Sequence, residues 1–146
     1  MSVAFFAGSF NPFTVGHASV VERALLMFDH IIIGVGINAQ KSESHDDDLF
    51  VIYEFCKRFP DDKVSVVSYS GELTVDVARR FGADCLLRGV RSVKDFEYER
   101  DLADVNRRVG GMETVLLFSL PEYSALSSSV VRELSSYGKD ISSLLP

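Results

Sequence analysis

The chain has 146 residues, of which 47% are hydrophobic and 25% are charged, and its formal net charge is −6. This balance is typical of a folded protein with its own core, and the length predicts one domain over residues 1–146. The negative charge argues against a general nucleic-acid binder, because such a protein needs a basic face. No apolar run is long enough to span a membrane, so we expect neither nucleic acid nor membrane as a partner.

The first apolar run, at residues 1–7, is too short for a secretory signal and has no positive flank. Two cysteines, Cys56 and Cys85, stand in apolar surroundings without metal-ligand spacing. We interpret them as buried thiols, which are typical of a reducing compartment. The sequence therefore predicts a cytoplasmic protein.

Apolar runs and helical periodicities alternate along the whole chain. Short runs, several of them rich in β-branched residues, predict five buried strands at residues 3–7, 31–37, 64–69, 84–88 and 114–118. Apolar residues at helical spacing predict helices at 17–28, 49–59 (with Asp48 as a candidate N-cap), 73–81, 95–109 and 127–137. This alternation predicts a single-domain α/β fold, a Rossmann-like, doubly wound parallel sheet of five strands with helices on both faces.

The loop after the first predicted strand, residues 8–17, has the sequence GSFNPFTVGH. Ligands of open parallel sheets bind beyond the carboxyl ends of the strands, where this loop is expected to lie. Gly8 lets backbone amides approach an anion, and His17 falls at a predicted helix start, where the helix dipole favours phosphate. The alternative is a turn with a helix-capping histidine, and the loop alone does not decide between the two.

Three further segments are expected at the same edge of the sheet, namely 38–41, 88–91 and 121–129. Arg88 and Arg91 end a buried strand and suit bidentate phosphate binding, although they could also be solvated surface residues. Ser127–Ser129 offer hydroxyls and free amides at a helix start, and a plain N-cap needs only one serine. Lys41 could supply a further cation.

Other charged segments have simpler interpretations. The acidic and basic residues of the helix at 95–109 indicate a solvated face with intrahelical ion pairs. The run His45–Asp48 favours helix capping and solubility over a metal site, and His30 starts a strand without a visible partner. The chain offers no Ser–His–Asp arrangement and no metal-ligand spacing, so its histidine, hydroxyls, cations and amide-rich turns indicate phosphoryl or nucleotidyl transfer.

Four motifs, in order along the chain, resemble those of the bacterial phosphopantetheine adenylyltransferases, which belong to the nucleotidyltransferase superfamily marked by a T/H-x-G-H motif. They are GSFNPFTVGH at 8–17, RGVRSVKDFEYE at 88–99, the pair Asn106–Arg107, and SSSVVREL at 127–134, and the resemblance covers residues 3–146. It implies an enzyme of coenzyme A biosynthesis that transfers AMP from ATP to 4′-phosphopantetheine, giving dephospho-coenzyme A and pyrophosphate. It also implies Mg²⁺ as cofactor, coenzyme A as a further ligand and a homohexamer.

The same resemblance implies roles for individual residues. His17 would stabilise charge at the α-phosphate, and Ser9 would bind the attacking phosphate and, with Phe10, border the nucleotide. Lys41 and Arg88 would neutralise the phosphates of both substrates, and Thr74 would contact the pantetheine arm through its backbone. The positions that match the ATP-binding segments are Gly89, Val90, Arg91, Glu99, Tyr123, Ser124, Ala125, Leu126, Ser127, Ser128 and Ser129.

The chain departs from the family pattern at a few positions. Ser9 stands where threonine is usual, Asn11 where aspartate is usual and Tyr123 where tryptophan is common, and the segment 42–48 differs from its relatives. Two alternatives remain at this level: a related nucleotidyltransferase with another acceptor, such as a cytidylyltransferase or a nicotinamide-nucleotide adenylyltransferase, and a weakly active module that binds a nucleotide or coenzyme A.

Overall fold

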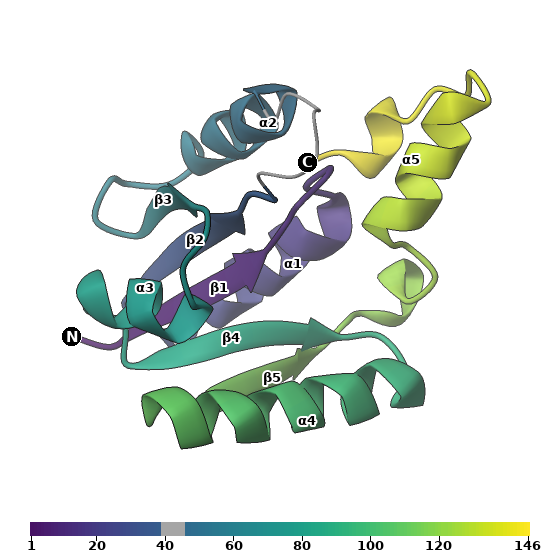
Figure 1. The fold of residues 1–146 in the computed structure, drawn as a ribbon. Helices are drawn as coiled ribbons and strands as arrows, with labels where there is room; N and C mark the ends of the chain where they lie inside the picture. The colour runs from purple at the N-terminus through teal and green to yellow at the C-terminus, as the bar shows by residue number, and fades with distance from the viewer. Residues whose placement is uncertain (39–45) are drawn as a thin grey trace.

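The protein is described by a computed structural model that covers residues 1–38 and 46–146. Its strands are β1 (Val3–Gly8), β2 (His30–Gly36), β3 (Val64–Tyr69), β4 (Cys85–Val90) and β5 (Thr114–Phe118). They form one parallel sheet in the order β3-β2-β1-β4-β5 (Figure 1). The order runs outward in opposite directions from β1 and β4, which is the doubly wound arrangement predicted from the sequence.

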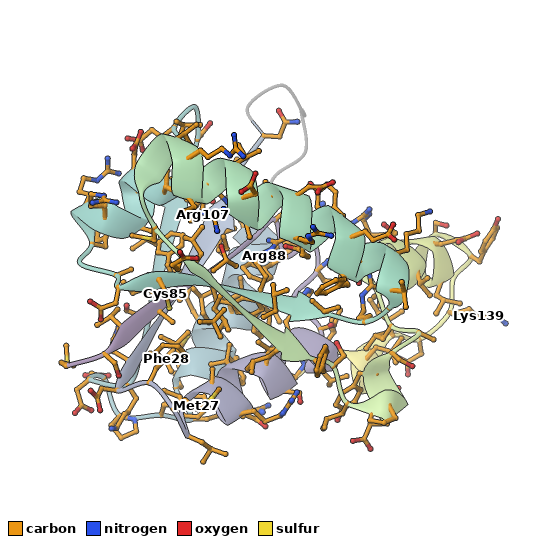
Figure 2. All side chains as sticks on the ribbon, turned by 90° about the horizontal axis from the view of Figure 1, so that it is seen from below. Met27, Phe28, Cys85, Arg88, Arg107 and Lys139 are labelled. Carbon is orange, nitrogen blue, oxygen red and sulfur yellow. The ribbon has the colours of Figure 1, made fainter. Side chains whose placement is uncertain are left out.

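The α-helices are α1 (Val15–Ala24), α2 (Asp46–Cys56), α3 (Thr74–Arg80), α4 (Val93–Gly110) and α5 (Ser128–Ser136), and short 3₁₀ helices cover Pro121–Tyr123 and Ser142–Leu144. Helices α1 and α2 pack on one face of the sheet, around Phe6, Ile33 and Leu87. Helices α3 and α4 lie on the other face, where Phe5 and Leu86 are buried (Figures 1 and 2). Successive residues of each buried strand therefore feed two separate apolar layers.

The predicted elements are all present, but several boundaries were wrong. Helix α1 begins at Val15, because Thr14 caps its amino end, and it ends at Ala24. Helix α2 begins at Asp46, so Asp48 lies inside its first turn and is not the N-cap. Strand β4 continues through Gly89 and Val90, and Ser92 rather than a later residue caps α4. At α1 and α4 a capping side chain moved the boundary by a few residues, and at β4 strand pairing did so.

The prediction that His30 has no partner was also wrong. Its Nδ1 lies 2.8 Å from the carbonyl oxygen of Asp62, and its Nε2 lies 2.8 Å from Oγ of Ser65. A carbonyl only accepts, so Nδ1 donates to Asp62 and Nε2 accepts from the serine. His30 thus ties the start of β2 to that of β3.

The expectation that both thiols are buried is confirmed for one of them. Cys85 is buried and Cys56 is half-buried, both are free, and burial raises the pKa of Cys56 to about 11. Within residues 1–38 and 46–146, no helix has the length and apolar character needed to cross a membrane.

Two glycines of β2 provide a matched test of how tightly the sheet is packed. A Cβ added at Gly34 would lie 2.2 Å from ring atoms of the fully buried Phe5, whereas one at Gly36 would meet Tyr69 at 3.5 Å, an ordinary contact. We expect Gly34→Ala to lower the free energy of unfolding by about 1–3 kcal/mol through overpacking. Gly36→Ala should leave it unchanged or slightly raised. Urea denaturation of both variants measures the difference, and equal stabilities would contradict this account.

Candidate active site

A pocket of about 390 Å³ lies beyond the carboxyl ends of β1 and β4, where the strand order reverses. Three of the four segments predicted at this edge line it. Its lining comprises Phe6, Ala7, Gly8, Ser9, Phe10, Thr14, Gly16, His17, Val20, Arg88, Gly89, Arg91, Asp95, Tyr98, Glu99, Ser119, Tyr123, Leu126, Ser127, Ser128, Ser129 and Arg132.

Four predicted site residues do not line this pocket, and a fifth is outside the part of the chain that the structure describes. Lys41 lies outside the described residues. Val90 is buried in β4, and Ser124 and Ala125 are not part of the lining. Thr74 begins α3, and its Oγ1 is 2.8 Å from the hydroxyl of Tyr69.

His17 caps a helix and also belongs to the pocket lining. As the third residue of α1, it completes a capping box: its Nδ1 accepts from the Thr14 amide at 2.9 Å, and its own amide donates to Thr14 Oγ1 at 3.4 Å. Its side chain also lines the pocket. The capping histidine therefore also borders the pocket, and the capping contact occupies only the Nδ1 edge of its ring.

The imidazole of His17 is held in its neutral form. Burial, followed by the positive charges of Arg88 and Arg91, lowers its pKa to about 4. Because Nδ1 accepts a hydrogen bond, the single ring proton resides on Nε2. His17 consequently offers the pocket an uncharged N–H donor and no general base at neutral pH.

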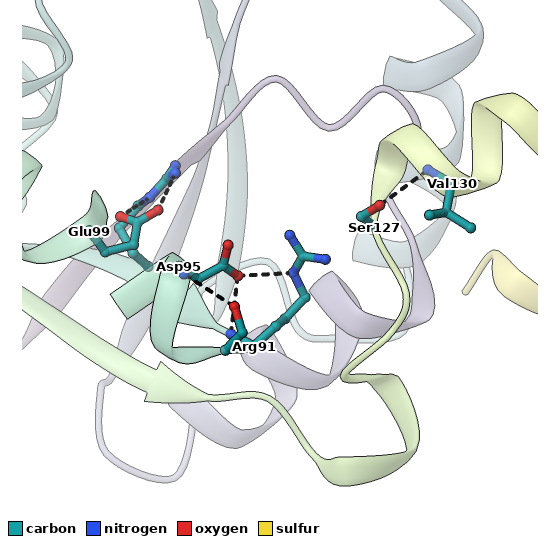
Figure 3. A network of polar contacts seen from close by, with 7 residues as sticks. Arg91, Asp95, Glu99, Ser127 and Val130 are labelled. Carbon is teal, nitrogen blue, oxygen red and sulfur yellow. Dashed lines mark hydrogen bonds and ion pairs between the residues drawn. The ribbon is translucent and has the colours of Figure 1, made fainter. Parts of the chain in front are cut away.

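Arg88 is held by three hydrogen bonds at the carboxyl end of β4. Its Nε and Nη2 donate to the two carboxylate oxygens of Glu99 at 2.9 and 2.7 Å (Figure 3). Its Nη1 donates to the Ala7 carbonyl at 2.5 Å. Burial disfavours the charged guanidinium, but the hydrogen bonds and charge of Glu99 outweigh this and raise the pKa of Arg88. Arg88 thus stays charged, with two N–H groups left for a ligand.

The solvated face predicted for α4 was wrong at Glu99. This carboxylate is only 6% exposed, and it is the one buried residue of the helix. Asp104 does form exposed intrahelical ion pairs with Arg107 and Arg108, as the sequence predicted for this helix. Pairing of Glu99 with a strand residue depends on how α4 docks on β4, which helical periodicity does not report.

A second carboxylate of α4 holds Arg91. Oδ2 of Asp95 accepts from the backbone amide of Arg91 at 3.2 Å and forms an ion pair with Nε of the same arginine, also at 3.2 Å. The Asp95 amide in turn donates to the N-cap Ser92 (Figure 3). The sequence analysis did not place Asp95 in the site. The signal was the spacing of Asp95 and Glu99, since carboxylates four apart lie on one helix face.

The start of α5 lines the pocket, and its first backbone amides have no partner within the helix. Only Ser127 acts as N-cap, with its Oγ accepting from the Val130 amide at 3.1 Å (Figure 3). Ser128 Oγ donates to the Pro12 carbonyl at 2.8 Å, which fixes the helix start against the first loop. The amides of Ser128 and Ser129 in the first turn have no intrahelical partner, which is the usual arrangement for binding an anion.

Arg132 is a site residue that the sequence analysis missed. Its Nη1 donates to the Asn11 carbonyl at 2.5 Å and its Nη2 to Ser129 Oγ at 3.2 Å. Within residues 1–38 and 46–146 it forms no ion pair, unlike Arg88 and Arg91. Its position three residues after Ser129, on the same helix face, was the available signal.

A family model described as cytidylyltransferase-like matches residues 5–134. The chain is also similar over nearly its full length to proteins named phosphopantetheine adenylyltransferase. It is 46% identical to that of Bacteroides thetaiotaomicron, over 100% of this chain and 96% of the relative. It is 49% identical to that of Porphyromonas gingivalis (99% and 94%) and 43% identical to that of Leuconostoc citreum (96% and 88%).

Solved structures confirm the fold class. A bifunctional NMN adenylyltransferase/ADP ribose pyrophosphatase from Francisella tularensis superposes with a TM-score of 0.69 at 15% identity, over 99% of this chain. The chain spans 44% of the length of that protein. At this identity the likeness concerns the fold alone.

The buried pair between Arg88 and Glu99 has an exposed counterpart on the same molecule, since Arg80 and Glu72 also form a two-point ion pair. Glu99→Gln should lower the free energy of unfolding by about 1–3 kcal/mol, because it leaves a half-buried guanidinium without its counterion. Glu72→Gln should leave stability unchanged, because water screens that pair. Urea denaturation compares the two variants, and similar small losses for both would show that the inner pair does not organise this edge of the sheet.

Proposed function

We infer what this chain does from the family to which it belongs: it is a member of the cytidylyltransferase-like family and, within it, of the phosphopantetheine adenylyltransferases. It transfers AMP from ATP to 4′-phosphopantetheine and releases pyrophosphate, a step of coenzyme A biosynthesis. The observation that carries this conclusion is the identity of 40–49% with relatives of that name over almost the full chain. The positions of its two most distinctive motifs, at 88–99 and 127–134, agree with it because both contribute to one pocket.

The chemistry of the reaction suits this pocket. A phosphate oxygen of the acceptor attacks the α-phosphorus of ATP, a new P–O bond forms, and the bond to the β-phosphate breaks to release pyrophosphate. The nucleophile is already an anion, so the protein needs to provide position and charge stabilisation rather than a base. A neutral His17 with its proton on Nε2 suits this requirement.

We propose the following roles for the pocket residues. His17 donates to an oxygen of the α-phosphate, where negative charge accumulates in the transition state. The amides at the start of α5, with Arg91, bind the phosphates that leave as pyrophosphate. Arg88 binds the acceptor phosphate through its two remaining N–H groups, and Ser9 contacts the same phosphate.

Further ligand contacts follow from the family. Lys41 assists charge neutralisation, and Thr74 contacts the pantetheine arm. The other predicted nucleotide contacts are Phe10, Gly89, Val90, Tyr123, Ser124, Ala125, Leu126 and Ser127. The geometry of Glu99 supports an indirect role in place of direct ATP contact, because Arg88 occupies both of its carboxylate oxygens.

Mg²⁺ enters this proposal as a partner of ATP. Within the described residues no group of three or more His, Cys, Asp or Glu side chains could hold a metal, and both carboxylates that line the pocket are paired with arginines. These residues therefore do not fit a dedicated magnesium site, and the ion would be carried by the substrate phosphates. A cytoplasmic location, a homohexamer and binding of coenzyme A remain predictions from the family.

Turnover tests the reaction itself. The protein mixed with ATP, Mg²⁺ and 4′-phosphopantetheine should release pyrophosphate in proportion to the dephospho-coenzyme A formed. Pantetheine without its phosphate should give no product, because the nucleophile is missing. ATP binding without pyrophosphate release would favour a binding module, and release with another phosphorylated or nucleotide acceptor only would favour a related transferase.

The role of His17 is tested by its alanine variant. His17→Ala should lower kcat by about 10²–10³-fold, the typical cost of one lost transition-state donor, with little change in the Kd of ATP. His30→Ala is the matched control, because His30 lies at the amino end of β2, away from the pocket. A loss of ATP affinity as large as the loss of kcat would mean that His17 binds the ground state.

A further inference from the structure

Three phenylalanine rings surround the imidazole of His17. The Phe13 ring stacks on it, with centroids 5.4 Å apart and an interplanar angle of 30°. The Phe10 ring meets it edge to face, at 5.0 Å and 86°, and the Phe6 ring lies at 6.2 Å. Phe10 and Phe13 are 3% and 0% exposed, so neither ring can move aside without disturbing the core.

Backbone geometry delivers Phe10 to this position. Its φ of 48° lies in the left-handed region, which residues with a side chain seldom adopt. In that conformation the ring enters the core and also packs against Phe6 at 5.1 Å and Phe13 at 5.3 Å. A sparsely populated backbone conformation persists only where surrounding contacts hold it in place, and such conformations cluster at functional sites.

The rings and the backbone constrain different motions of the imidazole. The stacked ring of Phe13 fixes the plane of the imidazole, and the edge contact with Phe10 restricts its rotation within the pocket. The Thr14 amide and hydroxyl lie 2.9 and 3.2 Å from Nδ1 and distinguish the two ring edges. A flipped ring would lose both polar contacts and would turn the other ring edge toward the pocket.

We propose that Phe10 and Phe13 are positioning residues for His17, holding the imidazole in the single orientation in which Nδ1 faces Thr14 and the Nε2 proton faces phosphates bound in the pocket. The bound phosphates in this statement rest on the proposed function, whereas the orientation of the ring does not. The three phenylalanine rings around His17 also keep water away from the imidazole. Positive charge around the same pocket comes from Arg88 and Arg91 at the end of β4 and from Arg132 of α5. Together these features keep the ring an uncharged donor.

Phe13→Leu is the main test, with Phe55→Leu as its matched control. Phe55 is 1% exposed and contacts Phe13 at 5.2 Å, and it has no ring contact with His17. Both variants remove one buried ring from the same cluster, so both should lose similar stability. Only Phe13→Leu should open space for water beside the imidazole.

The first measurement follows the ¹⁵N signals of His17 during a pH titration of the ligand-free protein. In the parent protein the signals should report a proton on Nε2 and a pKa of about 4. Phe13→Leu should raise the pKa toward the ordinary value of 6.5 and mix the two tautomers, because water reaches the ring and its orientation is no longer unique. Phe55→Leu should leave both properties unchanged.

The second measurement separates kcat from binding. Phe13→Leu should lower kcat about tenfold with a KM for ATP within about twofold of the parent, as expected for lost alignment in the transition state. Phe13→Met, whose flexible side chain has about the volume of leucine and fills irregular gaps but lacks the flat ring, should show the same direction if Phe13→Leu does not fold. Unchanged ¹⁵N signals in the Phe13 variants, or equal changes in Phe55→Leu, would overturn the proposal.

The two readouts also distinguish this proposal from the proposed reaction. A parent protein with the expected His17 signals but no pyrophosphate release would contradict the reaction and leave the orientation of the ring standing. A parent protein that turns over while His17 shows mixed tautomers would contradict the positioning role alone.

Discussion

The hydrogen bonds of Arg88, including its ion pair with Glu99, connect three of the elements that line the pocket. Arg88 belongs to β4, Glu99 to α4, and the third hydrogen bond of the guanidinium reaches the carbonyl of Ala7 in β1. The sheet order reverses between these two strands, and that is where an open parallel sheet leaves a crevice. Since Glu99 is the only buried side chain of α4, the helix is held over the crevice by a charge as well as by apolar contacts. The first loop and the start of α5 then close the pocket against this frame through Ser128, Arg132 and the carbonyls of Pro12 and Asn11.

The pairing of pocket arginines with carboxylates explains how a protein of net negative charge can suit a polyanionic substrate. The described lining contains three arginines and two carboxylates, so only one positive charge is in excess. Arg88 and Arg91 contribute aligned N–H groups whose charge is already balanced, and the neutral His17 and the free amides of α5 add donors without charge. Under the proposed function, binding of phosphate would therefore depend on preorganised hydrogen bonds more than on net charge. Such a pocket also limits the repulsion that several unpaired arginines would exert on each other while the site is empty.

The sequence was sufficient to predict the fold and three segments that line the pocket. These predictions rest on local sequence patterns. The strand at 64–69 was predicted to the residue, because a β-branched run bounded by breakers has few alternatives. Helix ends were less accurate where a side chain sets them, as Thr14 does for α1. The pairing of Glu99 with Arg88 and the partners of His30 join residues that only the docked elements bring together. No periodicity or motif carries that information, because it depends on tertiary contacts.

His17 shows most directly how folding and chemistry depend on the same contacts. The hydrogen bond from the Thr14 amide to Nδ1 stabilises the first turn of α1, and it also determines which nitrogen carries the proton. Any change that frees the ring therefore weakens a helix start and removes a donor from the pocket at once. This coupling explains why the histidine lies at the third position of the helix and not at its cap: from there one ring edge reaches back to the backbone while the other remains available to a phosphate. The helix start is thus part of the pocket itself, since its capping geometry selects the tautomer in which we propose that His17 acts.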